Sequence, residues 1–563
     1  MIRKRLGLKR LPGAVLLGLL LLLFSCALAA EPVFFVSPTG EDSAQAIHLV
    51  CVNNRKYYLF LPGNADPAAL RIGFTGAEKL ELNGAEVTGP LTAESLAEHN
   101  EIRFDGRKEI SFDVMRGSPG LPVLYITTET GGLKQIHSSK KNKEAGTLCM
   151  VNGAGETEYD GNLAYIKIRG NSSVRFPKRN YQIKLEKGTD LLGFGKAKKW
   201  ILTGNWLDRS MIRNQLNFDL AEYVGLPYTP EHQQAEVYIN HEYTGLYLLS
   251  EKVEVNEGRV DIRDLEKETE KLNEGELSGY ARKTERLSQT LAWKGYEIPD
   301  NPEDITGGYL LEYCKAKGNY QSAKSGFETR LNVYMEIRSP EYATKEQAAY
   351  IAAFMQGFEN AIFARSGIDP ETGKHYSEFV DMDSLVLKYM INEFSQNYDG
   401  NVASEFFFKP PDSVSKVAFA GPVWDMDNTY ASYAQANIAD VIGSPGFLYI
   451  ADAGSRYWWP NLYKHEDFRR RVGELYTERF AGAAKILLGL AEDPEGRLKS
   501  VEDYAQAIEA SAEMNFALHP GMREYLSEMK TGRTFRENIA YLCRFIEKRN
   551  RYLEKQWTGT TGE

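Results

Sequence analysis

The chain has 563 residues, of which 43% are hydrophobic and 12% aromatic. This composition excludes a disordered or fibrous protein, and the length allows two or three hydrophobic cores. The 67 basic and 77 acidic residues give a formal net charge of −10, so general nucleic-acid binding through phosphate neutralisation is not expected. Five cysteines without a C-x-x-C pair and eight histidines without an H-E-x-x-H motif argue against structural zinc and zincin chemistry.

The first thirty residues have the features of a secretory signal. Basic residues between positions 3 and 10 precede an apolar run over residues 11–30. Residues 27–29 form an A-x-A cleavage sequence, whereas Cys26 offers a site for lipid attachment. An uncleaved anchor is a third reading, because twenty mostly apolar residues can span a bilayer. We expect a secreted or cell-envelope protein that contacts a membrane only through this terminus.

Residues 31–120 are predicted to form a small β-sandwich accessory domain. Short runs of alternating polarity recur over residues 56–61, 70–74, 79–82, 101–104 and 109–114. The dipeptides Asn83-Gly84 and Asp105-Gly106 supply hairpin turns between them. Because no catalytic group stands out, we expect this domain to serve as a spacer or attachment module.

The pattern becomes mixed after residue 121, which predicts an α+β fold. Strands are expected over residues 121–127, 165–169 and 181–185, followed by a helix with Asp208 as its N-cap and a hairpin over residues 235–249. The charged stretch 266–304 is predicted to be a partly helical, mobile insertion. Helical spacing of apolar residues then characterises the last hundred residues.

The region from Asp383 to Tyr430 carries the clearest candidate for a catalytic site. A helix is expected from Asp383, then a strand over 405–409, a turn, and a second strand over 416–420. An antiparallel hairpin places the start of its first strand beside the end of its second, so Asp399 and Asp425 are predicted neighbours.

Asp425 and Asp427 lie two residues apart, and on an extended chain both would point the same way. Such hard oxygen ligands suit Mg²⁺ or Mn²⁺, and Asp399 could then orient or deprotonate a hydroxyl group. A solvated turn is the plainer reading of this pair. The apolar residues Val423 and Trp424 before it, and the third carboxylate, favour a functional site.

The order helix, aspartate, hairpin, aspartate is also the layout of a kinase catalytic core. A kinase needs an upstream strand lysine, for which Lys184 is the candidate, although its position equally suits a surface residue. Its acidic partner could be Asp219 or Glu222. The end of the next hairpin, with Glu251 and Lys252, would provide the linker that binds adenine.

The loop from Arg169 to Ser173 offers a guanidinium, backbone N–H groups and hydroxyls to an anion, with Asn171 and Ser172 at its centre. A tight turn with a surface arginine is the alternative reading of this loop. The chain has no G-x-G-x-x-G motif, so this loop would have to cover the phosphates in a different way.

Several ordered motifs resemble the spore coat protein H (CotH) kinase family. They are Arg169-Gly170-Asn171-Ser172-Ser173, residues 177–181, 199–202, Asn205, 208–214 and 238–247, and Trp424-Asp425-Met426-Asp427-Asn428. The resemblance covers about residues 121–430 well and the helical tail loosely, and the whole kinase-like domain is expected over 121–558.

This resemblance implies a divergent two-lobed protein-kinase-like fold that uses ATP and Mg²⁺ or Mn²⁺ to phosphorylate serine or threonine in secreted, envelope or spore-coat proteins. Asp399 matches the catalytic aspartate of the family and Asp425 its metal aspartate. Ser404 stands where ordinary kinases carry a metal-binding Asn, and Asn401 lies nearer to Asp399, which leaves a second metal site open. The alternative is a kinase-like surface module that binds without turnover.

Overall fold

The computed structural model describes residues 31–286, 292–314, 317–397, 399–400, 403–431, 458–524 and 532–559. The predicted signal with Cys26, and Asn401, lie outside these ranges. The chain divides into two compact units, one of residues 1–61 with 65–115 and the other of residues 62–64 with 116–563. Over the described ranges, none of the helices is both long and apolar enough to cross a membrane.

The first unit consists of two antiparallel sheets. The strand orders are β2-β1-β5 and β3-β4-β9-β8-β6-β7, and the rings of Phe34 and Phe112, one from each sheet, lie 5.4 Å apart. Asn83 and Gly84 both have positive φ, as do Asp105 and Gly106, which is the backbone that hairpin turns require. The strands are β1 (Val33–Ser37), β2 (Ile47–His48), β3 (Val50–Val52), β4 (Lys56–Leu61), β5 (Arg71–Thr75), β6 (Leu80–Leu82), β7 (Ala85–Glu86), β8 (His99–Phe104) and β9 (Lys108–Arg116).

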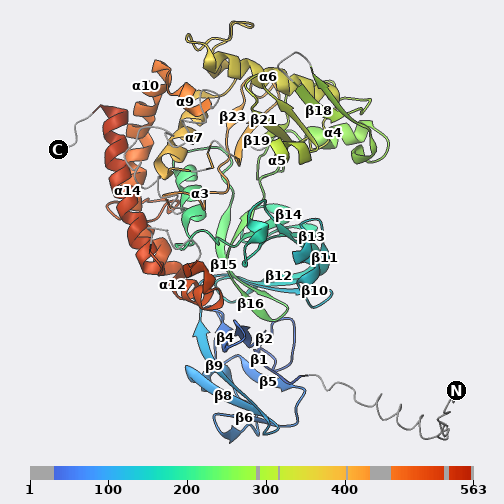
Figure 1. Ribbon diagram of the computed structural model, residues 1–563, viewed down its shortest axis with the longest axis vertical. Coiled ribbons are helices and arrows are strands. Elements are labelled where there is room, and N and C mark those ends of the chain that lie inside the picture. The colour runs from blue at the N-terminus through green and yellow to red at the C-terminus, as the bar shows by residue number, and fades with distance from the viewer. Residues whose placement is uncertain are drawn as a thin grey trace, which may run out of the picture. The chain divides into compact units, whose positions relative to one another are not determined.

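The second unit begins with a closed seven-stranded barrel in the order β10-β11-β12-β13-β14-β16-β15 (Figure 1). The barrel closes because β15 pairs in parallel with β10, whereas its other pairs are antiparallel. Its interior is filled by side chains such as Ile166, Ile183 and Trp200. The strands are β10 (Val123–Thr128), β11 (Glu144–Val151), β12 (Thr157–Arg169), β13 (Asn180–Asp190), β14 (Lys196–Thr203), β15 (His232–Ile239) and β16 (Glu242–Glu251), with α2 (Lys134–Ser138) between β10 and β11.

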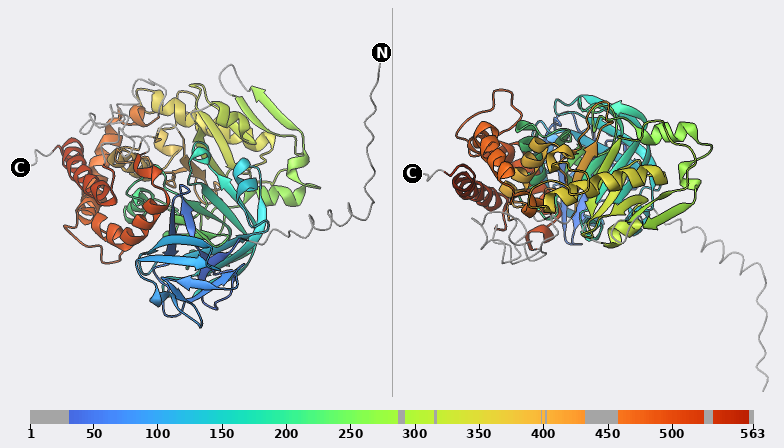
Figure 2. Two further views of the ribbon diagram at one scale, coloured as in Figure 1. Left: turned by 60° about the horizontal axis from the view of Figure 1, so that its bottom comes forward. Right: turned by 90° about the horizontal axis from the view of Figure 1, so that it is seen from above.

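A second seven-stranded sheet follows the barrel, in the order β17-β18-β20-β21-β19-β22-β23, and α6 lies across it (Figure 2). Its strands are β17 (Arg282–Arg286), β18 (Ala292–Tyr296), β19 (Tyr309–Cys314), β20 (Ser325–Glu328), β21 (Tyr334–Ser339), β22 (Glu405–Lys409) and β23 (Phe419–Ala420). The accompanying helices are α4 (Leu265–Leu272), α5 (Lys317–Ser322) and α6 (Lys345–Phe363).

The stretch 266–304, predicted to be an insertion, is built into this sheet. It is helical in α4 as expected, but β17 and β18 form the sheet edge, and Trp293 of β18 is buried. The edge strand β17 has the sequence RKTER and exposes most of its side chains, so its polarity conceals its role as a strand.

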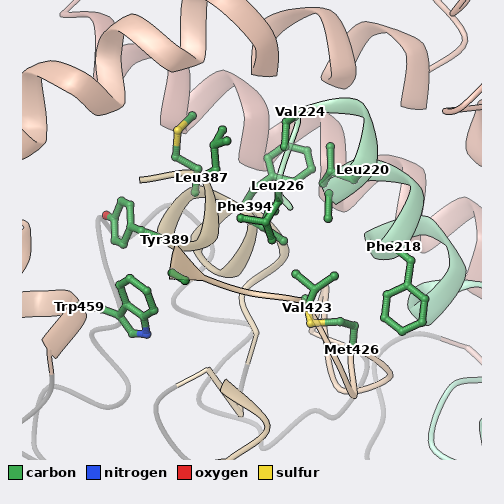
Figure 3. Close-up of a cluster of buried hydrophobic side chains, with 14 of the residues drawn as sticks. Phe218, Leu220, Val224, Leu226, Leu387, Tyr389, Phe394, Val423, Met426 and Trp459 are labelled. Carbon is green, nitrogen blue, oxygen red and sulfur yellow. The ribbon is translucent and has the colours of Figure 1, made fainter. Parts of the chain in front are cut away.

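Helices α3 (Arg213–Tyr223) and α7 (Met382–Ser395) share one hydrophobic core with residues 423–426 (Figure 3). The C-terminal region adds α9 (Trp458–Leu462), α10 (Glu466–Leu475), α11 (Ala481–Leu487), α12 (Val501–Leu518), α13 (Gly521–Glu524) and α14 (Phe535–Thr558). As predicted from their spacing, Phe535, Ile539 and Leu542 of α14 are buried. The protein is therefore a mixed α+β protein.

Asp208 is not the N-cap residue of α3, because the helix starts only at Arg213 and Ile212 occupies the cap position. The Asp208 carboxylate instead accepts hydrogen bonds from the Arg213 N–H (2.9 Å), from its guanidinium, and from the Ser210 hydroxyl (2.5 Å). It therefore stabilises the helix start from one turn further upstream.

Candidate active site

The predicted carboxylates meet in one cavity. Strands β22 and β23 pair antiparallel, with Phe407 opposite Ala420. Asp399, before the first strand, and Asp425 and Asp427, after the second, all line a cavity of about 650 Å³. The predicted proximity of Asp399 and Asp425 is confirmed.

The backbone around Asp425 differs from the expected extended chain. Asp425 adopts a left-handed conformation with φ of 59°, a region that non-glycine residues rarely occupy. Asp427 thus reaches the same cavity through a turn rather than by strand alternation. Ser404 also has positive φ, and its hydroxyl donates a hydrogen bond to Asp425 Oδ2 at 3.3 Å. Ser404, at the position of the kinase asparagine, therefore contacts the Asp425 carboxylate directly.

Helix α3 holds the loop that carries Asp425 and Asp427. Asn214 Oδ1 accepts a hydrogen bond from the Met426 N–H at 2.7 Å, and Arg213 Nε donates to the Thr429 carbonyl at 3.0 Å. Asn217 donates to the Thr429 hydroxyl at 3.2 Å. These contacts explain why residues 208–214 form one of the recognisable motifs. Sequence reasoning noted the motif but did not predict that its side chains position the acidic loop.

Asp399 lies just beyond the end of α7, where Gln396 turns left-handed with φ of 46°. The Asn397 side chain accepts a hydrogen bond from the Asp399 N–H at 3.0 Å and donates to Asn392 Oδ1 at 2.9 Å. Asn392 in turn donates to Glu405 Oε1 at 3.0 Å. A buried chain of polar side chains thus connects α7 and β22 to the segment that presents Asp399.

The electrostatics of the cavity favour a bound cation. Burial, together with the charge of Asp425, raises the pKa of Asp399 to about 6. Burial also raises the pKa of Asp425, although the Arg169 guanidinium counteracts it, and the pKa of Asp427 is raised well above its usual value by burial and by Asp425, Asp399 and Asp208. Mutual repulsion of this kind is relieved by a divalent metal. The donors are hard oxygens, so the residues present fit Mg²⁺ or Mn²⁺.

The Arg169 loop also lines the cavity. Arg169 ends β12 and its guanidinium lies 5.1 Å from the centre of the Trp424 ring, a cation–π contact. Asn171 and Ser172 line the same cavity. The structure thus brings the predicted anion-binding loop to the predicted metal carboxylates.

An adjoining cavity of about 310 Å³ shares Arg169, Asn171 and Glu312 with the first. Its wall includes Lys252, which had been predicted, and Lys167, which had not. Burial lowers the pKa of Lys252 to about 8 despite the charge of Glu254. Further lining residues that sequence reasoning missed come from β13, β19 and β21: Gln182, Glu312, Glu336 and Arg338.

Lys184 and Glu251 do not join this site. Lys184 faces outward from β13, between the buried Ile183 and Leu185, and lines a separate cavity of about 550 Å³. Asp219, one of its two candidate partners, binds His232 at 3.0 Å instead. The Glu251 carboxylate accepts a hydrogen bond from Arg259 Nε at 3.1 Å.

The other candidate partner of Lys184, Glu222, lies on α3, where burial and the charges of Glu231 and Asp219 raise the pKa of its carboxyl group. The sequence pattern shows that Lys184 points away from the barrel interior, but not which outer face meets the second sheet. The part of the barrel surface that meets the second sheet carries Lys167, which lines the cavity next to the carboxylates, whereas Lys184 lines a different cavity.

A further cavity of about 680 Å³ lies beside α4 and is lined by Arg263, Glu268 and Asp304 among others. Its charged groups already satisfy one another, since Arg263 pairs with both Glu268 and Asp304. It is therefore a weaker candidate for chemistry than the carboxylate cavity.

Residues 166–553 match the model of a known family, described as CotH kinase protein. The chain belongs to the CotH kinase family. No curated protein matches it. The CotH match covers the barrel from β12 onward, the second sheet and most of the helical region, so the residues that line the carboxylate cavity lie inside it. Membership of the CotH kinase family supports a kinase-like function, for which ATP and a divalent metal are the general requirements.

Proposed function

We propose that this protein is a secreted, metal-dependent protein kinase. It would transfer the γ-phosphoryl group of ATP to serine or threonine hydroxyls of extracellular, envelope or spore-coat proteins. The observation that supports this most is the convergence of Asp399, Asp425 and Asp427 on one cavity that Arg169 also lines. This arrangement combines metal ligands, an anion-binding group and a candidate base.

Each group has a role that follows from its chemistry. Asp425 and Asp427 would hold Mg²⁺ or Mn²⁺, which when bound neutralises charge on the phosphates. Arg169, with Asn171 and Ser172, would bind phosphate oxygens, and Lys252 extends this positive wall into the adjoining cavity.

Asp399 would accept the proton of the acceptor hydroxyl while the oxygen of that hydroxyl bonds to the γ-phosphorus. The bond from that phosphorus to the bridging oxygen breaks, and ADP leaves. Because its pKa is about 6, Asp399 is mostly ionised at neutral pH and remains basic enough to accept a proton.

The barrel and the second sheet would correspond to the two lobes of a kinase-like fold. In this reading the two connected cavities, which have walls from both sheets, form the cleft between lobes. Export would follow from the signal at residues 1–30, with lipid attachment at Cys26 as the route to an anchored form.

The experiment compares Asp425→Asn with Asp160→Asn, a matched change at an exposed position on β12. Label transfer from ATP radiolabelled on the γ-phosphate, to the protein itself or to a serine-rich acceptor, should require Mg²⁺ or Mn²⁺. Asp425→Asn should lower it by at least about a hundredfold, since it removes a charged group at the transition state. Asp160→Asn should leave it unchanged.

Calorimetry with Mg-ATP separates the remaining outcomes. Weak or absent binding of Mg-ATP, without any Asp425-dependent label transfer, would favour the inactive binding module. Transfer that survives Asp425→Asn would contradict the proposed site.

A further inference from the structure

Lysine side chains gather on the outer face of the barrel, beyond the cavities described above. Lys184 on β13 lies directly opposite Lys199 on β14, and on its other side it faces Tyr165 of β12. Like charges directly opposite each other in a sheet are destabilising. A folded protein that keeps such a pair has a local excess of positive charge at this point.

Three ammonium groups surround the ring of Tyr165. The Nζ atoms of Lys143, Lys167 and Lys184 lie 4.8, 5.9 and 5.9 Å from its centre. Cation–π attraction offsets part of their mutual repulsion. The proximity of Lys143 and Lys199 also helps to lower the pKa of Lys184, after the larger effect of burial.

Carboxylates balance part of this charge, and Asp190 of β13 lies directly opposite Lys196 of β14. Glu254 is shared by Lys199 at 3.1 Å, Lys252 at 3.0 Å and Arg259 at 2.7 Å. The outer cavity of about 550 Å³ is lined by Lys184, Lys196, Lys198 and Lys199, against Glu254 and Glu257. This group of lysines is locally positive although the chain as a whole has a net charge of −10.

The positive surface is continuous with the candidate active site. Lys167 and Lys252 line the cavity that adjoins the carboxylates, and Lys167 also approaches Tyr165. Strands β12, β13 and β14 are successive neighbours, so the lysines span about 10 Å across the strands. This span suits several residues of an extended polypeptide better than a single small anion.

We propose that this outer lysine face, defined as Lys143, Lys167, Lys184, Lys196, Lys198 and Lys199, binds an acidic segment of the acceptor protein. The identification of the bound chain as an acceptor rests on the proposed kinase function. Binding of an acidic segment does not depend on the kinase function, because it requires only the positive charge of the lysines and the outer cavity that they line. Aspartate and glutamate side chains of the acceptor would pair with these lysines, while the acceptor hydroxyl lies nearer Asp399.

Direct binding tests this without catalysis. Fluorescence anisotropy would compare a labelled peptide of alternating glutamate and serine with the same peptide carrying glutamine for glutamate, on the full chain. The test variant is Lys184→Glu/Lys198→Glu, and a matched control, Lys548→Glu/Lys555→Glu, makes the same charge change at exposed positions of α14. The test variant should fold, since Lys184→Glu places a carboxylate opposite Lys199.

The glutamate peptide should bind more tightly at low salt than at physiological salt, and the test variant should weaken binding by about tenfold or more relative to the control. Equal binding by the two double variants, or equal binding of the two peptides, would overturn the proposal. Weaker Mg-ATP binding with unchanged peptide binding would also overturn it, because the lysines would then belong to the nucleotide site.

A kinetic measurement links the surface to the acceptor. The acidic peptide should show a lower KM than the glutamine peptide, and the test variant should raise that KM with little change in kcat, as expected for uniform binding. Binding on the Asp425→Asn background distinguishes the two proposals. If peptide binding persists there while no label transfer occurs in the unaltered protein, the kinase function fails and the lysine face stands.

Discussion

At the level of single residues, the cavity concentrates acidic groups that resist ionisation. Asp399 is held through its backbone by Asn397, and its pKa of about 6 reflects burial and the nearby Asp425. A group that must accept a proton works only in its ionised form. Its pKa therefore determines how the reaction depends on pH.

We predict that kcat/KM for phosphoryl transfer rises with pH and has levelled off above about 6, because Asp399 loses its proton by then and a metal on Asp425 would move that loss to lower pH. Asp399→Asn should abolish this rise and lower the rate by about a hundredfold to ten-thousandfold. The measurement is initial rate against pH at saturating metal. A profile that keeps the same rise in Asp399→Asn would assign the titration to another group.

The sequence predicted the proximity of the two aspartates because hairpin geometry relates residues 26 apart in a fixed way. It did not predict that Lys167, rather than Lys184, would line the cavity next to these aspartates. Lys167 and Lys184 both lie between buried aliphatic residues on neighbouring strands, and local pattern does not distinguish them. The difference arises from the second sheet, whose Glu312 and Arg338 line the same cavity as Lys167, and local pattern does not report contacts between distant elements.

At the level of elements, α7 and β22 are joined beneath the site by a buried ion pair. Lys388 Nζ lies 3.4 Å from Glu405 Oε2, and both side chains are almost completely inaccessible. Burial raises the pKa of Glu405 to about 7 and lowers that of Lys388. The pair links the helix that ends near Asp399 to the strand of the catalytic hairpin.

Lys388→Met should destabilise the protein by about 3–5 kcal/mol above pH 7, because it leaves the Glu405 charge buried without its partner. Lys388→Met/Glu405→Gln should recover much of that loss, since the glutamine carbonyl can still accept from Asn392. Urea unfolding measures the free energy of unfolding of both variants. The control, Lys416→Met at an exposed position, should change that free energy by no more than about 0.5 kcal/mol. Equal losses in the single and double variants would contradict this account.

Elements with strong local patterns were predicted well. Strand 405–409 matches β22, and the hairpin over 235–249 falls within β15 and β16. The parallel pairing of β10 with β15 was not predicted, because it joins segments about a hundred residues apart with no local signal. The second predicted strand, 416–420, shortens to β23 at residues 419–420.

At the level of the whole molecule, buried acids make stability depend on pH. The pKa values of Glu236, Glu251 and Glu266 are raised to about 7 by burial. Each such group binds its proton more tightly in the folded than in the unfolded chain. Its contribution to stability is full below the ordinary carboxyl pKa and is lost as pH rises towards 7.

Without metal, the free energy of unfolding should therefore fall between about pH 4 and pH 7, as these groups ionise first in the unfolded chain. Mg²⁺ should restore stability more at pH 8 than at pH 5, because the ion binds ionised Asp425 and Asp427. At a Mg²⁺ concentration of about a hundred times the Kd, binding would add about 2.7 kcal/mol to the free energy of unfolding. Thermal melts with Mg²⁺ or with a chelator at pH 5 and pH 8 test this. A stabilisation by Mg²⁺ that is equal at the two pH values, or that persists in Asp425→Asn, would refute it.

The closed, filled barrel separates two kinds of evolutionary constraint along the same strands. On β12 and β13, inward residues such as Ile166 and Ile183 fill the interior, while their neighbours Lys167 and Lys184 meet solvent or cavities. If the proposed lysine face binds the acceptor, a mutation that exchanges one outward lysine would alter what the protein recognises and leave the packing of the barrel interior intact. Recognition can thus diversify between related proteins, one alternate residue at a time, with little cost to folding.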